Sequence, residues 1–121
     1  MESLKVVNLK EKLALFHDYW APRIVGDLNQ DYIKVAKFKG EFIWHSHEED
    51  ELFFVLKGNL CIHLRDQDLH LREGEFLVIP KGVEHKPYAK EEAHVLLIEP
   101  KNTLNTGNVE EKRTLKNPQR L

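Results

Sequence analysis

The sequence predicts an all-β protein, an antiparallel barrel or sandwich that follows one short helix. Between residues 31 and 100, short runs rich in β-branched and aromatic side chains alternate with turn signals. The connections between these runs are too short for the crossover helices that parallel strands require, so we expect antiparallel pairing. The expected strands are residues 32–38, 42–44, 51–56, 60–64, 69–71, 76–79 and 94–98, and the polar run 90–92 is expected to be a turn.

The chain of 121 residues is long enough for one hydrophobic core and too short for two ordinary domains. Asn8 with Glu11 is typical of a helix N-terminus with a capping box, and Pro22 prevents this helix from extending past Tyr19. The polar C-terminal segment is expected either to lie along a sheet edge or to fray. The expected segments are a helix and arm at residues 1–30, a β-barrel domain at 31–100 and an extended tail at 101–121.

Composition excludes several classes of function. The formal charge of -2 and the pI near 6.4 give no basic surface of the kind that binds nucleic acid. The longest apolar runs, residues 52–56 and 95–98, are far shorter than the roughly 20 residues that span a bilayer. The N-terminus lacks the pattern of a signal peptide, and the lone Cys61 cannot form an internal disulfide. We therefore expect a cytoplasmic protein that binds neither nucleic acid nor a membrane.

Four potential metal ligands occur in two short stretches. His45 and His47 are two residues apart, so on a strand their side chains share one face about 7 Å apart. Glu51 opens the next expected strand, and His85 follows a tight turn after the strand 76–79. Three imidazoles and one carboxylate suit Fe, Mn, Ni, Cu or Zn better than Ca or Mg, which prefer oxygen ligands. The sequence therefore predicts one divalent transition metal ion on these four side chains, with open positions if the ion is six-coordinate.

The spacing His45-x-His47-x3-Glu51-x6-Gly58, followed by Gly74-x5-Pro80-x-Gly82-x2-His85, resembles the two signature motifs of the cupin superfamily. Only 15 residues separate the two motifs, as in the small single-domain microbial cupins. The resemblance covers about residues 33–99 and implies a jelly-roll barrel, also called a double-stranded β-helix, that holds the metal ion inside. It also implies a homodimer in which terminal segments exchange contacts.

Two positions depart from the usual cupin pattern. Gly40 lies five residues before His45, where the family usually has six, and Ala89 stands where an Asn often closes the second motif. Neither position is an expected ligand, so the departures concern loop geometry rather than metal binding.

The resemblance implies a metalloenzyme of the isomerase or dioxygenase class that acts on a small polar molecule, without naming that molecule. An isomerase of the mannose-6-phosphate type calls for basic side chains facing the barrel interior, for which only Arg65 and Lys57 are candidates. A thiol dioxygenase calls for a Tyr near the metal, for which Tyr88 is a candidate. The alternatives are a non-catalytic, metal-dependent protein that binds or senses a small ligand, and an accessory cupin.

Several further side chains have two possible roles at this stage. Glu84 either orients an imidazole or is solvated, and His63 is either a proton shuttle or a surface residue. Trp20 either caps the barrel mouth or contacts a partner subunit. Side chains on the ligand face should wall the site, namely Ile43, Phe53 and Val55. Those on the opposite face should pack on the N-terminal arm or a partner, namely Leu52, Phe54 and Leu56. The remaining histidines expected at the surface are His17, His70 and His94.

Overall fold

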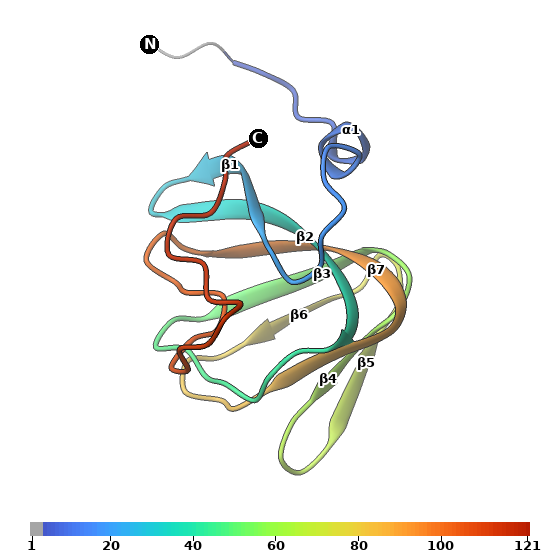
Figure 1. The fold of residues 1–121 in the computed structure, drawn as a ribbon, viewed down its shortest axis with the longest axis vertical. Coiled ribbons are helices and arrows are strands. Elements are labelled where there is room, and N and C mark those ends of the chain that lie inside the picture. Colours follow the sequence, from blue (N-terminus) through green and yellow to red (C-terminus); the bar gives the residue numbers. More distant parts are fainter. Residues whose placement is uncertain (1–3) are drawn as a thin grey trace.

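The computed structural model describes residues 4–121, which form one helix and seven strands (Figure 1). Every pairing between these strands is antiparallel, and they make one curved sheet in the order β1-β2-β7-β3-β6, with β4 between β5 and β7. The predicted all-β antiparallel class with a short N-terminal helix is therefore confirmed. The bounds are α1 Leu9–Leu13, β1 Arg23–Leu28, β2 Asp31–Glu41, β3 Glu51–Lys57, β4 Leu60–His63, β5 Asp68–Leu71, β6 Phe76–Ile79 and β7 Lys86–Pro100.

The longest strand, β7, joins the two halves of the sheet. Its second half lies between β2 and β3, and its first half pairs with β4 (Figure 1). The predicted turn at residues 90–92 was wrong, because β7 runs through it. The pairs Phe38–Ala93 and Gly40–Ala89 leave three residues of β7 opposite one of β2. The polar run is thus a bulge that bends the strand and exposes its side chains, which gives it the composition of a turn.

Residues 42–44, which were predicted as a strand, are irregular. Gly40 has a φ of 78°, and the regular part of β2 ends one residue later. Beyond it the chain stays close to the start of β7, where Phe42 donates a backbone hydrogen bond to Pro87 (2.9 Å). His45 then forms an isolated bridge with His85. The segment is extended but forms no continuous ladder of backbone hydrogen bonds, so it is not a strand despite its strand-like composition.

The hydrophobic core fills the barrel. Phe53 and Val55 of β3 are buried in it and Ile43 packs against it, as the alternation along the sequence indicated. A smaller cluster on the outer side of the sheet joins Leu13 and Phe16 of the N-terminal segment to β1 and β2. The helix itself begins as expected, because the side chain of Asn8 accepts a hydrogen bond from the backbone N–H of Glu11 (2.9 Å).

The C-terminal segment lies along the edge of the sheet beside β1. The backbone N–H of Ile24 donates to Gln119, and that of Leu121 donates to Ile24 (both 2.9 Å). On the way, the chain passes the loop before β3, where Asn108 donates to Ser46 (2.9 Å). Of the two alternatives for the tail, the structure shows the sheet-edge position (Figure 1). No helix within residues 4–121 has the length and apolar character needed to cross a membrane.

Candidate metal centre

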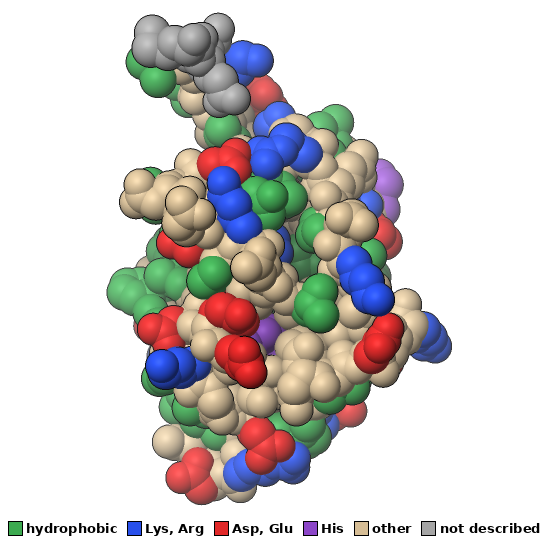
Figure 2. Space-filling model, turned by 90° about the vertical axis from the view of Figure 1, so that its left-hand side faces the viewer, with side chains coloured by type: hydrophobic (Ala, Val, Ile, Leu, Met, Phe, Trp, Pro, Cys, Tyr) green, Lys and Arg blue, Asp and Glu red, His purple; other side chains and the backbone are tan. Residues whose placement is uncertain are grey.

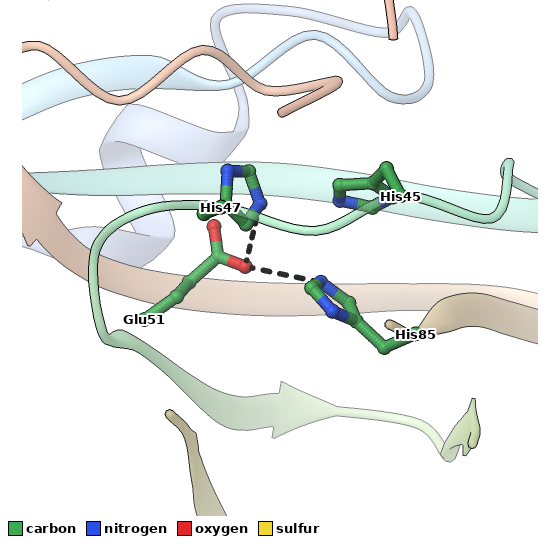
Figure 3. A group of neighbouring side chains, drawn as sticks. All are labelled: His45, His47, Glu51 and His85. Carbon is green, nitrogen blue, oxygen red and sulfur yellow. Dashed lines mark ion pairs between the residues drawn. The ribbon is translucent and has the colours of Figure 1, made fainter. Parts of the chain in front are cut away.

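The four predicted ligands lie together inside the barrel (Figure 3). His45 and His47 come from the segment after β2, Glu51 is the first residue of β3, and His85 immediately precedes β7. The bridge between His45 and His85 consists of two backbone hydrogen bonds of 3.0 and 2.9 Å, which fix these two residues side by side. The four residues are 3%, 6%, 3% and 0% exposed, and one potential ligand atom from each lies within 4.8 Å of the others.

Backbone carbonyl groups orient two of the imidazoles. The Nδ1 atom of His45 lies 2.9 Å from the carbonyl oxygen of Ile43, and that of His85 lies 2.9 Å from the carbonyl oxygen of Val83. A carbonyl oxygen only accepts hydrogen bonds, so in both rings Nδ1 carries the proton of the neutral form. The unprotonated Nε2 atoms are then free to bind a metal ion in the fixed orientation that ligating histidines usually have.

The centre brings potential ligand atoms of Glu51, His85 and His47 face to face. Glu51 Oε1 lies 3.5 Å from Nε2 of His85 and 3.3 Å from Nε2 of His47. Among the described residues, these three atoms and Nδ1 of His47 are buried without a hydrogen-bond partner. Buried polar atoms without partners are costly, and two facing lone pairs repel each other. A cation between the facing atoms would satisfy them. Ligand atoms of a metal ion lie about 3 to 3.4 Å apart, given metal–ligand bonds near 2.1 Å, so the spacing fits.

The electrostatics of the centre keep the donors in the form that binds a metal. Burial, followed by the nearby His85, lowers the pKa of His45 to about 4, so its imidazole is neutral near pH 7. Burial alone would raise the pKa of Glu51, but the surrounding polar groups of Glu99, His47 and His85 lower it well below its usual range. Glu51 is therefore a carboxylate beside the neutral imidazole of His45.

A buried ion pair lies directly behind Glu51. Lys34 Nζ donates a hydrogen bond to Glu99 Oε1 (2.8 Å), and both side chains are almost completely buried. Burial, followed by the negative charge of Glu51, raises the pKa of Glu99 well above its usual range. Sequence reasoning missed this pair. The sequence did carry a sign of it. Side chains alternate along β2, so Lys34 is on the same inward face as Ala36 and Phe38, where a charged residue is out of place.

Aromatic rings close the barrel beside the centre. The ring of Trp20 stacks on those of Phe38 and Phe42, with centroids 4.3 and 4.8 Å apart, and its Nε1 donates to the carbonyl oxygen of Lys39 (2.9 Å). Trp20 is buried and lines a cavity of about 20 Å³, which is room for about one water molecule. The structure therefore shows the barrel-capping position for Trp20. The other lining residues include His45, Glu51, Phe53, Leu97, Glu99 and Asn105.

Comparison with known proteins assigns the family. The family model described as a cupin domain matches residues 33–99, more than half of the chain. The chain belongs to the cupin family. This cupin is also 37% identical over 86 residues to the uncharacterized protein YdbB of Bacillus subtilis, covering 69% of this chain and 70% of YdbB. The expected family is confirmed.

A solved structure confirms the fold of this cupin. A cupin-2 domain containing protein from Shewanella frigidimarina superimposes with a TM-score of 0.78 at 48% sequence identity, covering 79% of this chain and 95% of that protein. The jelly-roll architecture expected from the motifs is thereby confirmed, and the Gly40 and Ala89 departures leave it intact.

Named dioxygenases are among the relatives of this cupin. The 3-hydroxyanthranilate 3,4-dioxygenase of Xenopus tropicalis is 27% identical over 89 residues, covering 67% of this chain. The match spans only 32% of the length of the dioxygenase. The likeness therefore concerns a part of the dioxygenase rather than the whole enzyme.

A depression outside the barrel reaches the centre at His47. It has a volume of about 630 Å³, and its wall includes the acidic Glu48 and Glu49, the basic Lys81 and Asn108 of the C-terminal segment. On the face shown in Figure 2, a histidine is visible beside acidic side chains. Of the four donors, only His47 lines this depression, whereas His45 and Glu51 line the small cavity beside Trp20.

The remaining candidate residues lie away from the centre. His63 and Tyr88 stack with ring centroids 5.9 Å apart and line a depression on the outer face of the sheet, so His63 is not placed to shuttle protons to the four donors. Glu84 pairs with Arg65 (3.1 Å), and both side chains are more than half exposed. Lys57 is exposed at the end of β3. Neither Arg65 nor Lys57 therefore faces the barrel interior.

Proposed function

We propose that this cupin is a metalloenzyme that holds one divalent transition metal ion, Fe, Mn, Ni, Cu or Zn, on His45, His47, Glu51 and His85. The observation that carries the proposal is the contact of Glu51 Oε1 with Nε2 of His85, the nitrogen that carries no proton when the neutral ring donates from Nδ1 to the carbonyl of Val83. A bound ion would supply Lewis-acid or redox chemistry at the positions that four protein ligands leave open.

The residues of the chain would divide the remaining work. The backbone carbonyls of Ile43 and Val83 hold two imidazoles in the ligating tautomer. Trp20 and the rings stacked on it wall one side of the centre and leave room there for only about one water molecule. The depression beside His47 would admit the substrate, which we propose to be a small polar molecule.

Between the two reaction classes, dioxygenation is the better supported. The basic side chains available for a phosphosugar, Arg65 and Lys57, do not face the centre, which weakens a mannose-6-phosphate isomerase type of activity. A named relative is a dioxygenase. Dioxygenation needs no further reductant, because both atoms of one O2 enter the substrate.

Metal content tests the first part of the proposal. We expect the chain purified without added metal to contain a transition metal, or to take it up on titration, and His47→Ala to lose one equivalent. The matched control His17→Ala changes an exposed histidine outside the group and should lose none. Elemental analysis of the three proteins gives the result. An unaltered chain that neither contains nor takes up any transition metal would contradict the proposal.

Oxygen uptake tests the second part. The metal-loaded chain is mixed with 3-hydroxyanthranilate, the substrate named for a relative. Consumption of one O2 per substrate molecule, lost in His47→Ala and kept in His17→Ala, is the result expected of a dioxygenase that accepts this aromatic class.

A non-catalytic, metal-dependent binding or sensing protein is the second candidate. The cavity of about 20 Å³ beside the donors weakens the case for turnover of an aromatic substrate, because that volume does not admit one without movement of the wall. A chain that holds its metal ion, gains thermal stability with small carboxylates and consumes no oxygen with any of them would support this candidate over the enzyme.

The location and assembly of this cupin are further parts of the proposal. A cytoplasmic location agrees with the single cysteine.

A homodimer is supported by β6, an edge strand on which Phe76 is 61% and Val78 45% exposed. Light scattering should give a dimer mass for the unaltered chain and a monomer mass for Phe76→Lys. The division into an arm (1–30), a barrel domain (31–100) and a tail (101–121) stays a prediction.

A further inference from the structure

The hairpin of β4 and β5 carries a second group of metal-binding side chains, on the face that points away from the barrel core. Leu60 and Ile62 of β4 are buried in the core. Side chains alternate along a strand, so Cys61 and His63 face outward. In the strand register Cys61 lies opposite His70, which is therefore on the same outer face. His63 lies opposite Asp68 in the same way, so the hairpin places four donors in a square.

We propose that Cys61, His63, Asp68 and His70 form a second site, which binds a zinc-class divalent ion independently of the barrel centre. A thiolate, two imidazoles and one carboxylate are the donor types of tetrahedral Zn²⁺ sites.

Three of the four donors already lie at nearly the required separation. Cys61 Sγ is 3.8 Å from Nδ1 of His63, and that nitrogen is 2.7 Å from Oδ1 of Asp68. One ligand atom from each of these residues lies within 4.8 Å of the others. Bond lengths of about 2.3 Å to sulfur and about 2.1 Å to nitrogen or oxygen give tetrahedral edges of roughly 3.4 to 3.6 Å. The sulfur–nitrogen distance thus shortens slightly, and the nitrogen–oxygen distance opens by less than about 1 Å.

His70 can complete the set by rotation of its side chain. Residues directly opposite in an antiparallel pair have Cβ atoms about 5 Å apart, within reach of a shared ion. The side chain of His70 is exposed, so core packing does not hold it in one rotamer.

The surroundings suit a site that is open on one side. The four residues line a depression of about 440 Å³ together with Tyr88 and Lys90 of β7. Exposure rises from Cys61 (9%) through the His63 side chain (25%) to the Asp68 side chain (50%), so the thiol forms the floor and the carboxylate the rim. The ring of Tyr88 stacks on His63 and limits its rotation.

A simple ion pair between His63 and Asp68 is the competing explanation of the short contact. That pair accounts for two of the four side chains and leaves the thiol and His70 without a role. The metal site predicts a property that the ion pair lacks, which is a metal–thiolate bond.

Cobalt binding distinguishes this site from the barrel centre, because only this site has a thiol. Cys61 is the single cysteine of the chain, and the barrel centre has only nitrogen and oxygen donors. With Co²⁺ added to the reduced full chain, we expect two equivalents to bind and a thiolate-to-cobalt charge-transfer band to appear in the near ultraviolet. Cys61→Ser should lose the band and one equivalent, whereas His47→Ala should keep the band and lose the other equivalent. The control His17→Ala should keep both.

Two results would overturn the proposal. One is the absence of the thiolate band when the barrel centre has filled. The other is a band that persists in the triple variant His63→Ala/Asp68→Ala/His70→Ala, because Cys61 would then bind without the site. If Cys61→Ser fails to fold, protection of the thiol in the unaltered chain gives the answer. Saturating Zn²⁺ should then slow modification of Cys61 by a thiol reagent, and an unchanged rate would count against the site. Failure here leaves the barrel proposal intact, since the thiolate signal reports on the hairpin alone.

Discussion

The barrel interior and the outer face of the β4–β5 hairpin each collect metal-binding side chains, but they do so with different degrees of preorganisation. In the barrel, the four donors are buried and two imidazoles are held by backbone carbonyls. On the hairpin, His63 and Asp68 are partly exposed and held by one another. The interior group has donors that point at a common centre before any ion binds, whereas the hairpin group has to rearrange.

The two groups also differ in how their charge is balanced. Inside the barrel, Glu51 faces a second carboxyl, Glu99, whose raised pKa favours the uncharged form and which accepts a hydrogen bond from Lys34. On the hairpin, solvent screens the charge of Asp68, and the only partner needed is His63. Changes of charge should therefore alter the free energy of unfolding strongly inside the barrel and weakly on the hairpin.

The largest loss of unfolding free energy is expected for Lys34→Met. This change removes the ammonium group that donates to the buried Glu99 and favours its charged form, and removing one partner of a buried pair costs about 3–5 kcal/mol of unfolding free energy. Lys34→Met/Glu99→Leu should recover most of that loss, because it removes both charges from the core. The exposed control Lys101→Met, which loses a pair with Asp27, should cost less than about 1 kcal/mol. Urea unfolding measures all three. A loss below that of the control would show that Glu99 is held neutral without Lys34.

His45 should make the free energy of unfolding change by about 3 kcal/mol with pH. Its pKa is about 4 in the folded protein, against an ordinary value of 6.5, so between these values the unfolded chain binds a proton that the folded chain does not. The metal-free protein should therefore keep this stability above pH 6.5 and lose it as the pH falls towards 4. The variant His45→Gln should lack this part of the slope, while Glu51 and Glu99 still titrate in both proteins. Parallel curves of unfolding free energy against pH would contradict the prediction.

The sequence was sufficient for the parts of this cupin that depend on local composition and spacing. The donor residues were identifiable because two motifs place them at fixed distances from turn-forming residues such as Gly58 and Pro80. The antiparallel class followed from strand lengths and short connections. Both are properties of neighbouring residues, and folding did not alter them.

The parts that failed depend on contacts between distant segments. Residues 90–92 have the composition of a turn, but only the pairing of β7 with β2 makes them a bulge. Lys34 was out of place at an inward-facing position, but its pairing with Glu99 across 65 positions is not visible locally. The depression beside His47 depends on the C-terminal segment folding back, which composition did not decide.

Glu99→Gln should weaken metal binding about tenfold, which is about 1.4 kcal/mol. Glu99 contacts the predicted ligand Glu51, and residues that support a ligand typically change affinity by about 10 to 100-fold when replaced. Glu91→Gln, an exposed change on the same strand, is the matched control. Competition with a chelator measures both. Equal affinities in Glu99→Gln and the control would limit Glu99 to balancing the charge of Lys34.

The smallest effect on stability is expected for Asp68→Asn. The His63–Asp68 pair is partly exposed, and pairs of this kind contribute about 0.2 to 1 kcal/mol, so the unfolding free energy should change by no more than that. Asp66→Asn, an exposed change in the turn of the same hairpin, should have no larger effect. The two variants should nevertheless differ in cobalt binding, because only Asp68 supplies a ligand. A loss of stability well above about 1 kcal/mol would mean that the pair is a structural element of the hairpin. An unchanged stability with loss of one cobalt equivalent would show that Asp68 acts as a metal ligand rather than as a structural element, although the hairpin lacks the buried support of the barrel.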